Sequence, residues 1–235
     1  MAVSHNPVYL IAGGRSSMAR HGPDPLIQEA LRLAAIAQPA VAYVGAASGD
    51  NAAFRTLIAR LLRKAGAGDV QLAPLCGSRA DPRKAMRIIE GCHIVFMSGG
   101  DVEAGMRVLS EKGMIDFLRN QYRKGKPFFG ISAGSIMLAK NWVRWSDPEV
   151  DSSAELFPCL GIAQVYCDTH DEGNGWEELH VLARLIPAGS VSYGITSGTA
   201  LAAYPDGLVC ALGGEVHRFI RKGGIVTQIE SLTPS

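Results

Sequence analysis

The sequence FFGISAGS, residues 128–135, contains the turn that determines the fold. Ser132 stands between Gly130 and Gly134 in a G-x-S-x-G pattern, after a short apolar strand and before a helix predicted from Ser135 to Lys140. This pattern is typical of a sharp strand-to-helix turn, in which small neighbours are needed where backbones crowd and the central side chain projects above the sheet. We therefore predict that the Ser132 hydroxyl is a nucleophile. The alternative is an ordinary glycine-rich turn with Ser132 as a helix N-cap.

Short apolar runs alternate with segments of helical periodicity up to this turn. The alternation indicates a mainly parallel sheet with helices on both faces, and continuous apolar runs are typical of strands buried on both sides. The predicted fold class is therefore α/β, a doubly wound, flavodoxin-like sheet. Strands are predicted at residues 8–12, 41–44, 70–75, 94–97 and 127–130, and helices at residues 25–37, 52–65, 82–90 and 103–123, the last weakened at Gly105 and Gly113.

Glycine-rich segments of this half of the chain lie where predicted strands end. In doubly wound sheets, sites form at the carboxyl ends of strands, near a topological switch point. We therefore expect chemistry at the edge of the sheet that carries Gly13-Gly14, Gly45, Gly99-Gly100 and Ser132.

The last third of the chain has a different pattern. Residues 141–160 are interpreted as an irregular connection, and tight glycine turns between the last apolar runs predict antiparallel C-terminal hairpins appended to the sheet. No linker divides the chain, so a single domain over residues 1–235 is expected. The predicted elements are strands at residues 163–167, 191–195, 201–204, 208–212, 216–220 and 225–229, and a helix at residues 176–186.

The composition argues against several classes of protein. Hydrophobic residues make up 47% and charged residues 19% of the chain, which is typical of a folded core rather than of disorder. A formal net charge of +1 with scattered basic residues argues against a nucleic-acid partner. The chain shows no signal-peptide pattern and no apolar run of membrane-spanning length, so we expect no membrane partner and a cytoplasmic location. Five isolated cysteines predict neither a disulfide framework nor a metal site.

A serine nucleophile requires a general base, which is usually a histidine. His170 lies in the polar segment CDTHDEG, residues 167–173, at the carboxyl end of a predicted strand, where a partner for Ser132 is expected. A histidine on a surface loop is the alternative interpretation. The other histidines are assigned to structural or surface positions: His5, His21, His93, His180 and His217.

Four segments, in this order, resemble a known family. They are SGGD at residues 98–101, GISAGS at residues 130–135, DTH at residues 168–170 and GTAL at residues 198–201. The chain resembles the serine peptidase family that includes aspartyl dipeptidase (peptidase E) and cyanophycinase, whose fold is similar to that of class I glutamine amidotransferases. Order and rough spacing agree along most of the chain.

The resemblance implies a role for each matching residue. Ser132 would be the nucleophile, His170 the general base, and the backbone amides of Gly100 and Ala133 the oxyanion hole. The amide of a small peptide-like substrate would transfer its acyl group to Ser132, and water would then hydrolyse the acyl-enzyme. The resemblance implies no metal or organic cofactor, and it implies a homodimer because relatives form them.

The chain departs from the family where relatives carry an acidic residue that orients the histidine. Ser197 stands at the aligned position, or Thr196 if the register slips, and neither is a carboxylate. A hydroxyl can accept from the imidazole N–H but cannot stabilise imidazolium by charge, and loss of a triad carboxylate can cost on the order of 10⁴ in turnover. Three outcomes stay open: another acid substitutes, a Ser-His dyad suffices, or activity is weak. Candidates for orienting His170 or contacting substrate are Asp168, Ser197 and Asp101, with Asp171 and Glu172 as further acids.

A second departure follows His170. Relatives carry an aromatic residue and an arginine-rich helix there, whereas residues 171–178 read DEGNGWEE and only Arg184 remains nearby. This acidic stretch would repel an aspartyl carboxylate and suits a cationic or neutral group better. The alternative for Glu177 and Glu178 is the negative first turn of a helix, which the helix dipole favours.

Two rival functions follow from these departures. A catalytically weak or inactive binding protein on the same fold is the first, because the acid expected near Ser197 is missing. A synthetase-associated amidotransferase is the weaker rival, since such enzymes use cysteine at the turn and deliver ammonia to a partner domain.

Overall fold

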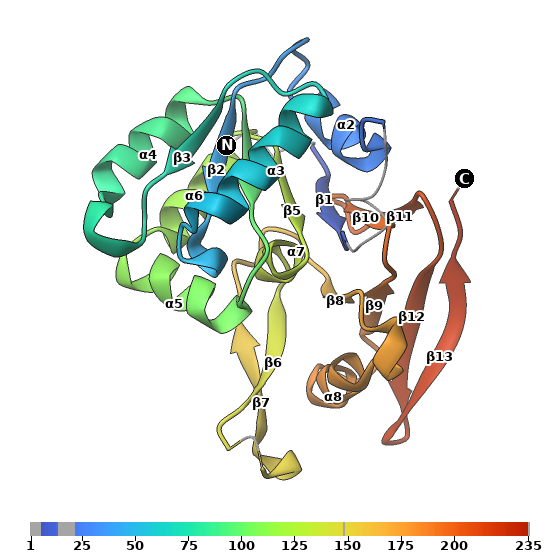
Figure 1. Cartoon of the computed structure of the whole chain (residues 1–235). Coiled ribbons are helices and arrows are strands. Elements are labelled where there is room, and N and C mark those ends of the chain that lie inside the picture. Colours follow the sequence, from blue (N-terminus) through green and yellow to red (C-terminus); the bar gives the residue numbers. More distant parts are fainter. Residues whose placement is uncertain (1–5, 14–21, 148, 235) are drawn as a thin grey trace.

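The central sheet of the protein is mainly parallel, and antiparallel strands extend one edge. The computed structural model describes residues 6–13, 22–147 and 149–234 (Figure 1). The strand order is β11-β10-β1-β5-β4-β2-β3, in which β1 to β5 run parallel and β10 and β11 are antiparallel. Its strands are β1 (Val8–Ile11), β2 (Val41–Val44), β3 (Val70–Ala73), β4 (Ile94–Met97), β5 (Phe128–Ile131), β10 (Ala200–Ala203) and β11 (Val209–Leu212).

Helices cover both faces of this sheet. Alternate residues of a strand point to opposite faces, so Leu10 and Phe128 pack into one core and Tyr9 and Phe129 into the other. The first core contains buried residues of α4 (Pro82–Gly91), α5 (Val102–Glu111), α6 (Ile115–Arg123) and α7 (Ala133–Leu138). The second core contains those of α2 (Pro25–Arg32) and α3 (Ala52–Lys64). The continuous apolar runs in the sequence reflect burial on both faces.

The strand order creates a switch point between β2 and β4. The connection after β2 leads outward to β3, whereas the connection after β4 leads to β5 in the opposite direction. The short helix η1 (Ala46–Ser48) follows β2, and the segment 98–101 follows β4. The backbone amide of Asp101 donates to the Ala47 carbonyl at 2.9 Å, which joins these two connections beside the end of β5.

A second sheet lies beside the carboxyl edge of the first. Its order is β13-β12-β9-β8, with β8 and β9 parallel and the other pairs antiparallel. Helix α8 connects β8 to β9 and packs on this sheet, with Leu179 and Leu182 of the helix in one apolar cluster with Phe219 of β12 (Figure 1). The elements are β8 (Tyr166–Thr169), η4 (Glu172–Asn174), α8 (Glu177–Leu185), β9 (Val191–Ile195), β12 (Val216–Lys222) and β13 (Ile225–Leu232).

Residues 141–160 form a hairpin, so the prediction of an irregular connection is wrong. Strands β6 (Asn141–Trp145) and β7 (Ala154–Pro158) pair antiparallel around η3 (Asp151–Ser153). Figure 1 shows the hairpin extending away from the central sheet and beside α8. Val143 belongs to the same apolar cluster as α8, which gives this two-stranded unit a tertiary partner.

The α/β fold with a mainly parallel sheet is confirmed, and the differences are local. The helix predicted over residues 103–123 divides into α5 and α6, because Gly113 has a positive φ of 64°. The C-terminal hairpins separate: β10 and β11 join the central sheet, whereas β12 and β13 complete the second sheet. The short helix η2 (Gly77–Arg79) precedes α4. Predictions that involve His5, Gly14 and His21 lie outside the described residues.

Among the described helices, none is both long and apolar enough to cross a membrane.

Candidate active site

Ser132 occupies a strained turn between β5 and α7. Its backbone has φ 54° and ψ −127°, a conformation that non-glycine residues rarely adopt, and it caps the N-terminus of α7. Its amide donates to the Ile11 carbonyl at 2.9 Å, and its carbonyl accepts from the Ser135 amide at 2.8 Å. These bonds hold the turn from both sides, so the hydroxyl projects at the carboxyl end of the central sheet.

Gly134 permits the close packing of this turn against β4. A Cβ atom on Gly134 would lie 2.1 Å from the Met97 carbonyl oxygen and 2.9 Å from that of Ser98. No side chain fits at such distances without movement of the backbone. The second glycine of the G-x-S-x-G pattern is therefore a steric requirement of the turn.

His170 meets Ser132 from the second sheet. It directly follows β8, and its Nε2 lies 2.7 Å from the Ser132 Oγ. His170 also has a positive φ of 48°, and its amide donates to the Ile195 carbonyl at 2.9 Å, which ties it to the end of β9. The structure thus brings together the two residues that the sequence predicts as nucleophile and base, at a distance suitable for proton transfer.

Gly100 and Ala133 line the same pocket as Ser132. Ala133 is the first residue of α7, where amides have no partner within the helix and the helix dipole is positive. Gly100 has φ 143°, and a Cβ there would lie 2.1 Å from the Ala47 carbonyl oxygen. Both backbones can therefore approach an oxygen atom bound beside Ser132.

Glu172 is a carboxylate on the loop that follows His170. Its Oε1 accepts from the Ser197 amide at 3.0 Å. Burial opposes the charge on Glu172, but hydrogen bonds with Ser197 and the nearby His170 outweigh burial and lower the pKa of this carboxyl. Glu172 thus supplies negative charge from the loop after β8, whereas the position that aligns with the family's acid holds Ser197.

The other proposed orienting groups make different contacts. Asp101 caps α5, its Oδ1 accepting from the Ala104 amide at 2.7 Å. Asp168 Oδ1 accepts from the Thr169 amide at 2.7 Å. Thr196 donates to the Glu215 carbonyl at 2.9 Å. Asp101 and Asp168 still line the pocket that contains Ser132.

Ser132 and His170 open onto a cavity of about 390 Å³ between the two sheets. Its carboxylates come from α5, β8, the loop after β8, and α8. Trp142 of β6, Val102 and Ile136 also line it. The lining residues are Gly100, Asp101, Val102, Ser132, Ala133, Ile136, Trp142, Asp168, Thr169, His170, Asp171, Asn174 and Glu178.

Asp168 is the most deeply buried carboxyl of this cavity, with 5% of its surface exposed. Burial is the main cause that raises the pKa of Asp168 from 3.8 to about 7. The hydrogen bond from the Thr169 amide lowers this pKa, whereas the nearby Glu178 and Asp171 raise it further. Because the folded protein keeps this proton up to about pH 7 and the unfolded chain releases it near pH 4, the native state loses stability as the pH rises through that interval.

We expect Asp168→Asn to remove this loss of stability. The amide oxygen of asparagine can still accept from the Thr169 amide. Above pH 7 the variant should exceed the wild type in unfolding free energy, by on the order of 2–4 kcal/mol, whereas at pH 4 the two should differ little. Urea unfolding at several pH values from 4 to 8 measures this difference. If the difference in unfolding free energy between the variant and the wild type stayed constant from pH 4 to 8, Asp168 would not bind a proton more tightly in the folded state.

Other described histidines have structural contacts away from Ser132. His93 Nδ1 accepts from the Ala40 amide at 2.9 Å. His180 packs on Phe219, and His217 packs on Trp176. These contacts agree with the structural positions that the sequence indicates for them.

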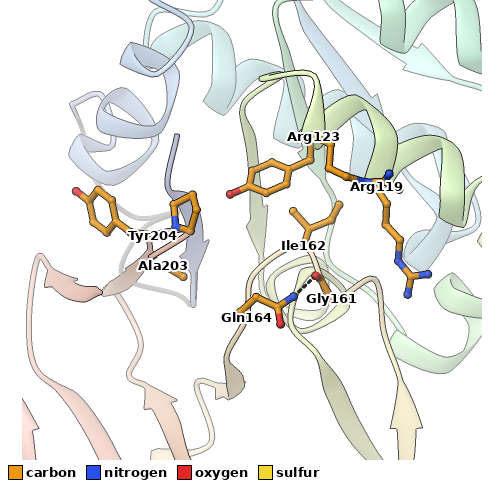
Figure 2. A pocket seen from close by; sticks show the side chains of 9 residues that line it. Arg119, Arg123, Gly161, Ile162, Gln164, Ala203 and Tyr204 are labelled. Atoms are coloured by element: carbon orange, nitrogen blue, oxygen red, sulfur yellow. Dashed lines mark hydrogen bonds between the residues drawn. The ribbon is translucent and has the colours of Figure 1, made fainter. Parts of the chain in front are cut away.

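A second cavity, of about 270 Å³, lies at the opposite end of the central strands (Figure 2). Ala203 lines it and pairs with Val8, the first residue of β1. Arg119 donates to the Leu160 carbonyl at 2.7 Å, and Gln164 donates to the Gly161 carbonyl at 2.6 Å. Its lining contains no carboxylate or histidine, so it resembles a surface depression rather than a catalytic site.

Sequence reasoning missed Trp142 and left two interpretations open for Glu178. Trp142 falls in the segment interpreted as irregular, although N-W-V-R-W at residues 141–145 alternates as a strand does. Glu178 is in the first turn of α8, as its alternative interpretation states, yet it also lines the cavity. Glu178 reaches the cavity because of the path of the chain between β8 and α8. No local sequence pattern reveals this path.

No group of three or more His, Cys, Asp or Glu residues suited to a metal ion occurs in residues 6–13, 22–147 and 149–234.

Comparison by sequence gives a match over most of the chain. A model described as Peptidase family S51 matches residues 8–208. Pyridoxal 5'-phosphate synthase subunit PdxT of Geobacillus stearothermophilus is 31% identical over 81 residues, 34% of this chain and 41% of that protein. The subunit of Hyperthermus butylicus is 34% identical over 64 residues, 27% of this chain and 32% of that protein. The chain therefore matches less than half the length of these curated relatives.

Comparison by structure gives a match over nearly the whole chain. A peptidase from an acI-B1 Actinobacterium has a TM-score of 0.73 at 18% identity, with 97% of each chain covered. A putative peptidase E protein from Listeria monocytogenes EGD-e has a TM-score of 0.63 at 12% identity, with 97% of this chain and 100% of that chain covered. At these identities the likeness establishes the shared fold.

Proposed function

Because the chain belongs to peptidase family S51, and is therefore a hydrolase of the peptidase class, we propose that it cleaves an amide bond of a small peptide or isopeptide through a covalent ester on Ser132. The observation that carries this proposal is the 2.7 Å contact between the Ser132 hydroxyl and the His170 imidazole at the base of an open cavity. A serine hydroxyl is a weak nucleophile until such a base accepts its proton.

The reaction proceeds in two halves. His170 Nε2 takes the proton of Ser132 as Oγ attacks the carbonyl carbon, and His170 then gives that proton to the departing amine. Water attacks the acyl-enzyme in the second half, again with His170 as the base, and the acid product leaves. No step of this sequence requires a group other than the protein and water.

The backbone amides of Gly100 and Ala133 stabilise the oxyanion of both tetrahedral intermediates. The first belongs to the loop after β4, and the second begins α7. Both residues line the cavity onto which Ser132 opens. Donors that are fixed before the reaction need no reorganisation when charge develops, and one such donor is typically worth about 10²–10³ in turnover.

Glu172 favours the imidazolium form of His170 that arises in each half-reaction. It provides the charge that the hydroxyl of Ser197 cannot provide. Because Glu172 is exposed to solvent, its charge is screened more than that of a buried triad carboxylate. Its contribution is accordingly smaller than that of a buried acid.

We expect Glu172→Gln to lower kcat by about tenfold to a hundredfold, below the roughly 10⁴-fold loss typical of a buried triad acid. Glutamine can still accept from the Ser197 amide, so the loop should keep its conformation. Without the negative charge, the acid limb of the pH–rate profile should move to lower pH. Glu177→Gln, a change at an exposed residue of α8, is the matched control and should leave both quantities unchanged. An unaltered pH profile in Glu172→Gln would contradict this positioning role.

Labelling by a fluorophosphonate probe tests the proposed function directly, since the probe reacts with activated serine hydroxyls. Wild-type protein should be labelled, and mass spectrometry of the digested adduct should locate the label on Ser132. A screen of dipeptides and isopeptides, analysed by liquid chromatography, should find a substrate. Absence of both labelling and cleavage would favour the second candidate, a binding protein that has lost turnover, for which Ser197 at the position of the expected acid is the supporting observation.

A further inference from the structure

The cavity beside Ser132 is strongly acidic. Asp101, Asp168, Asp171 and Glu178 line it, and among its lining residues neither lysine nor arginine occurs. The carboxylate of Asp101 is occupied as the cap of α5. The other three, which we call the acidic pocket, lie on β8, on the loop after β8 and on α8, around the proposed base His170.

Two oxygen atoms of the acidic pocket are buried without a protein donor. Asp168 uses Oδ1 to accept from the Thr169 amide, and Asp171 uses Oδ1 to accept from Asn174 at 2.8 Å. The Oδ2 atoms of both residues have no hydrogen-bond partner in the described part of the chain. A buried acceptor without a donor costs about 1–3 kcal/mol. Asp168 is 95% buried and also lines the cavity, so its incompletely bonded carboxyl lies next to the space that a ligand would occupy.

Neighbouring carboxyls destabilise the negative charge of two residues of the acidic pocket, Asp168 and Glu178. Burial first, and then Glu178 and Asp171, raise the pKa of Asp168. Burial first, and then Asp171, raise the pKa of Glu178, and the nearby Trp142 indole lowers it in part. A positive charge placed among them would reverse these effects and favour the ionised forms.

The acidic pocket is better suited to an organic cation than to a metal ion. Its carboxylates do not converge into a group that could hold a metal. The cavity lining combines these carboxylates with the apolar and aromatic side chains of Val102, Ile136 and Trp142. A ligand with an apolar stem and a cationic head bearing several N–H donors matches this distribution, and this is the form of lysine and arginine side chains.

A side-chain cation and an α-ammonium group differ in their distance from the scissile carbonyl. An α-ammonium nitrogen lies only about 2.5 Å from its own carbonyl carbon, the atom that Ser132 attacks. A cation at the end of a side chain has the reach to contact Asp168 while the carbonyl stays at Ser132.

We propose that the substrate carries a lysine or arginine side chain next to the scissile amide, and that Asp168, Asp171 and Glu178 bind its cation. This proposal rests on the proposed hydrolysis at Ser132 and names the class of substrate for that site. It predicts a preference opposite to that for an aspartyl residue, because a carboxylate in this cavity would meet only like charges.

Matched dipeptide pairs test the proposal. Arg-Leu is compared with citrulline-Leu, and Lys-Leu with norleucine-Leu, because each pair differs in charge at similar size. Leu-Arg and Leu-Lys, with their neutral counterparts, test the leaving-group side. In at least one order, wild-type protein should hydrolyse the cationic member with a kcat/KM higher by about tenfold or more.

The triple variant Asp168→Asn/Asp171→Asn/Glu178→Gln should bring this ratio close to one. Glu177→Gln, which changes an exposed neighbour of Glu178 in the same turn, should keep the wild-type ratio. A ratio near one in wild-type protein, or a preference that survives in the triple variant, would overturn the proposal. Fluorophosphonate labelling of a wild-type protein without cationic preference would leave the hydrolase mechanism standing and remove only the acidic pocket's role.

Calorimetric binding provides the readout if no dipeptide is cleaved. Arginine amide and citrulline amide are titrated into the Ser132→Ala variant, which lacks the proposed nucleophile. Tighter binding of arginine amide supports the acidic pocket even if the chemistry at Ser132 fails. Equal affinity for the two amides, or no binding of either, overturns the proposal.

Discussion

Replacing Ser132 by alanine should lower kcat by about 10⁴- to 10⁶-fold and abolish fluorophosphonate labelling. The change removes only the Oγ atom that contacts His170, and the positive φ at this position is equally strained with alanine. The Tm of the variant should therefore stay close to that of the wild-type protein, because substitutions outside the core usually change stability little. Stopped assays of a cleaved peptide and gel fluorescence of the labelled protein measure the two effects.

Ser135→Ala is the matched control for this experiment. Ser135 lies in the same turn, but its buried hydroxyl donates to the Ile11 carbonyl at 2.9 Å rather than facing the cavity. Its removal should lower the unfolding free energy by about 1 kcal/mol while labelling continues. Equal labelling of wild-type protein and Ser132→Ala would place the reactive hydroxyl elsewhere.

Gly134→Ala should destabilise the protein by about 3 kcal/mol or more, because the added Cβ would overlap the Met97 carbonyl oxygen at 2.1 Å. For a chain of this length, that loss corresponds to a fall in Tm of roughly 6–12 °C. The shift of backbone that relieves the overlap must also move Ser132, two residues away. Labelling of the folded fraction should therefore fall together with Tm. Differential scanning calorimetry and labelling on the same sample measure both.

Gly91→Ala separates this overlap from the general effect of changing a helical glycine. Gly91 ends α4, and a Cβ there would meet no atom within 4 Å. Its Tm should stay the same or rise slightly, since alanine is favoured over glycine in helices. Similar Tm values for Gly134→Ala and Gly91→Ala would show that the turn does not require close approach.

The helices and strands of the doubly wound half of the fold could be predicted from the sequence, because local residue patterns and burial agree there. Runs such as Ile94–Met97 are apolar throughout, since both faces of the central sheet are covered, and the glycines at strand ends mark its carboxyl edge. The boundaries of α5 and α6 also follow from Gly113, which the sequence marks as a weak point. In these segments each local preference points to the same structure.

The second sheet could not be predicted from the sequence in the same way. Nothing in the local sequence of β8 and β9 separates them from the strands of the central sheet. Only the tertiary pairing of β8 with β9 and of β9 with β12 assigns them to a second sheet. The β6–β7 hairpin depends on the contact of Val143 with the cluster of α8, a long-range interaction that no periodicity encodes.

The same contrast applies to the candidate site. The motif around Ser132 and the strand end at His170 can be recognised from residue type and position. Glu172 is one of several acids that the sequence offers, and its selection depends on the turn that carries its carboxylate to the Ser197 amide. Trp142 and Glu178 reach the cavity only through the packing of the hairpin and α8 against the central sheet.

The Ser132–His170 contact spans the boundary between the two sheets, with one partner after β5 and the other after β8. A shift of about one ångström between the sheets would lengthen the 2.7 Å contact beyond hydrogen-bond range without altering either residue. Hydrogen bonds near this boundary, such as that from the Lys140 amide to the Val165 carbonyl at 2.9 Å, therefore help to fix the distance between Ser132 and His170. The turnover rate therefore depends on how the two sheets are placed relative to each other. Substitutions at the boundary between the sheets, remote from Ser132 and His170, should lower kcat before they cause unfolding.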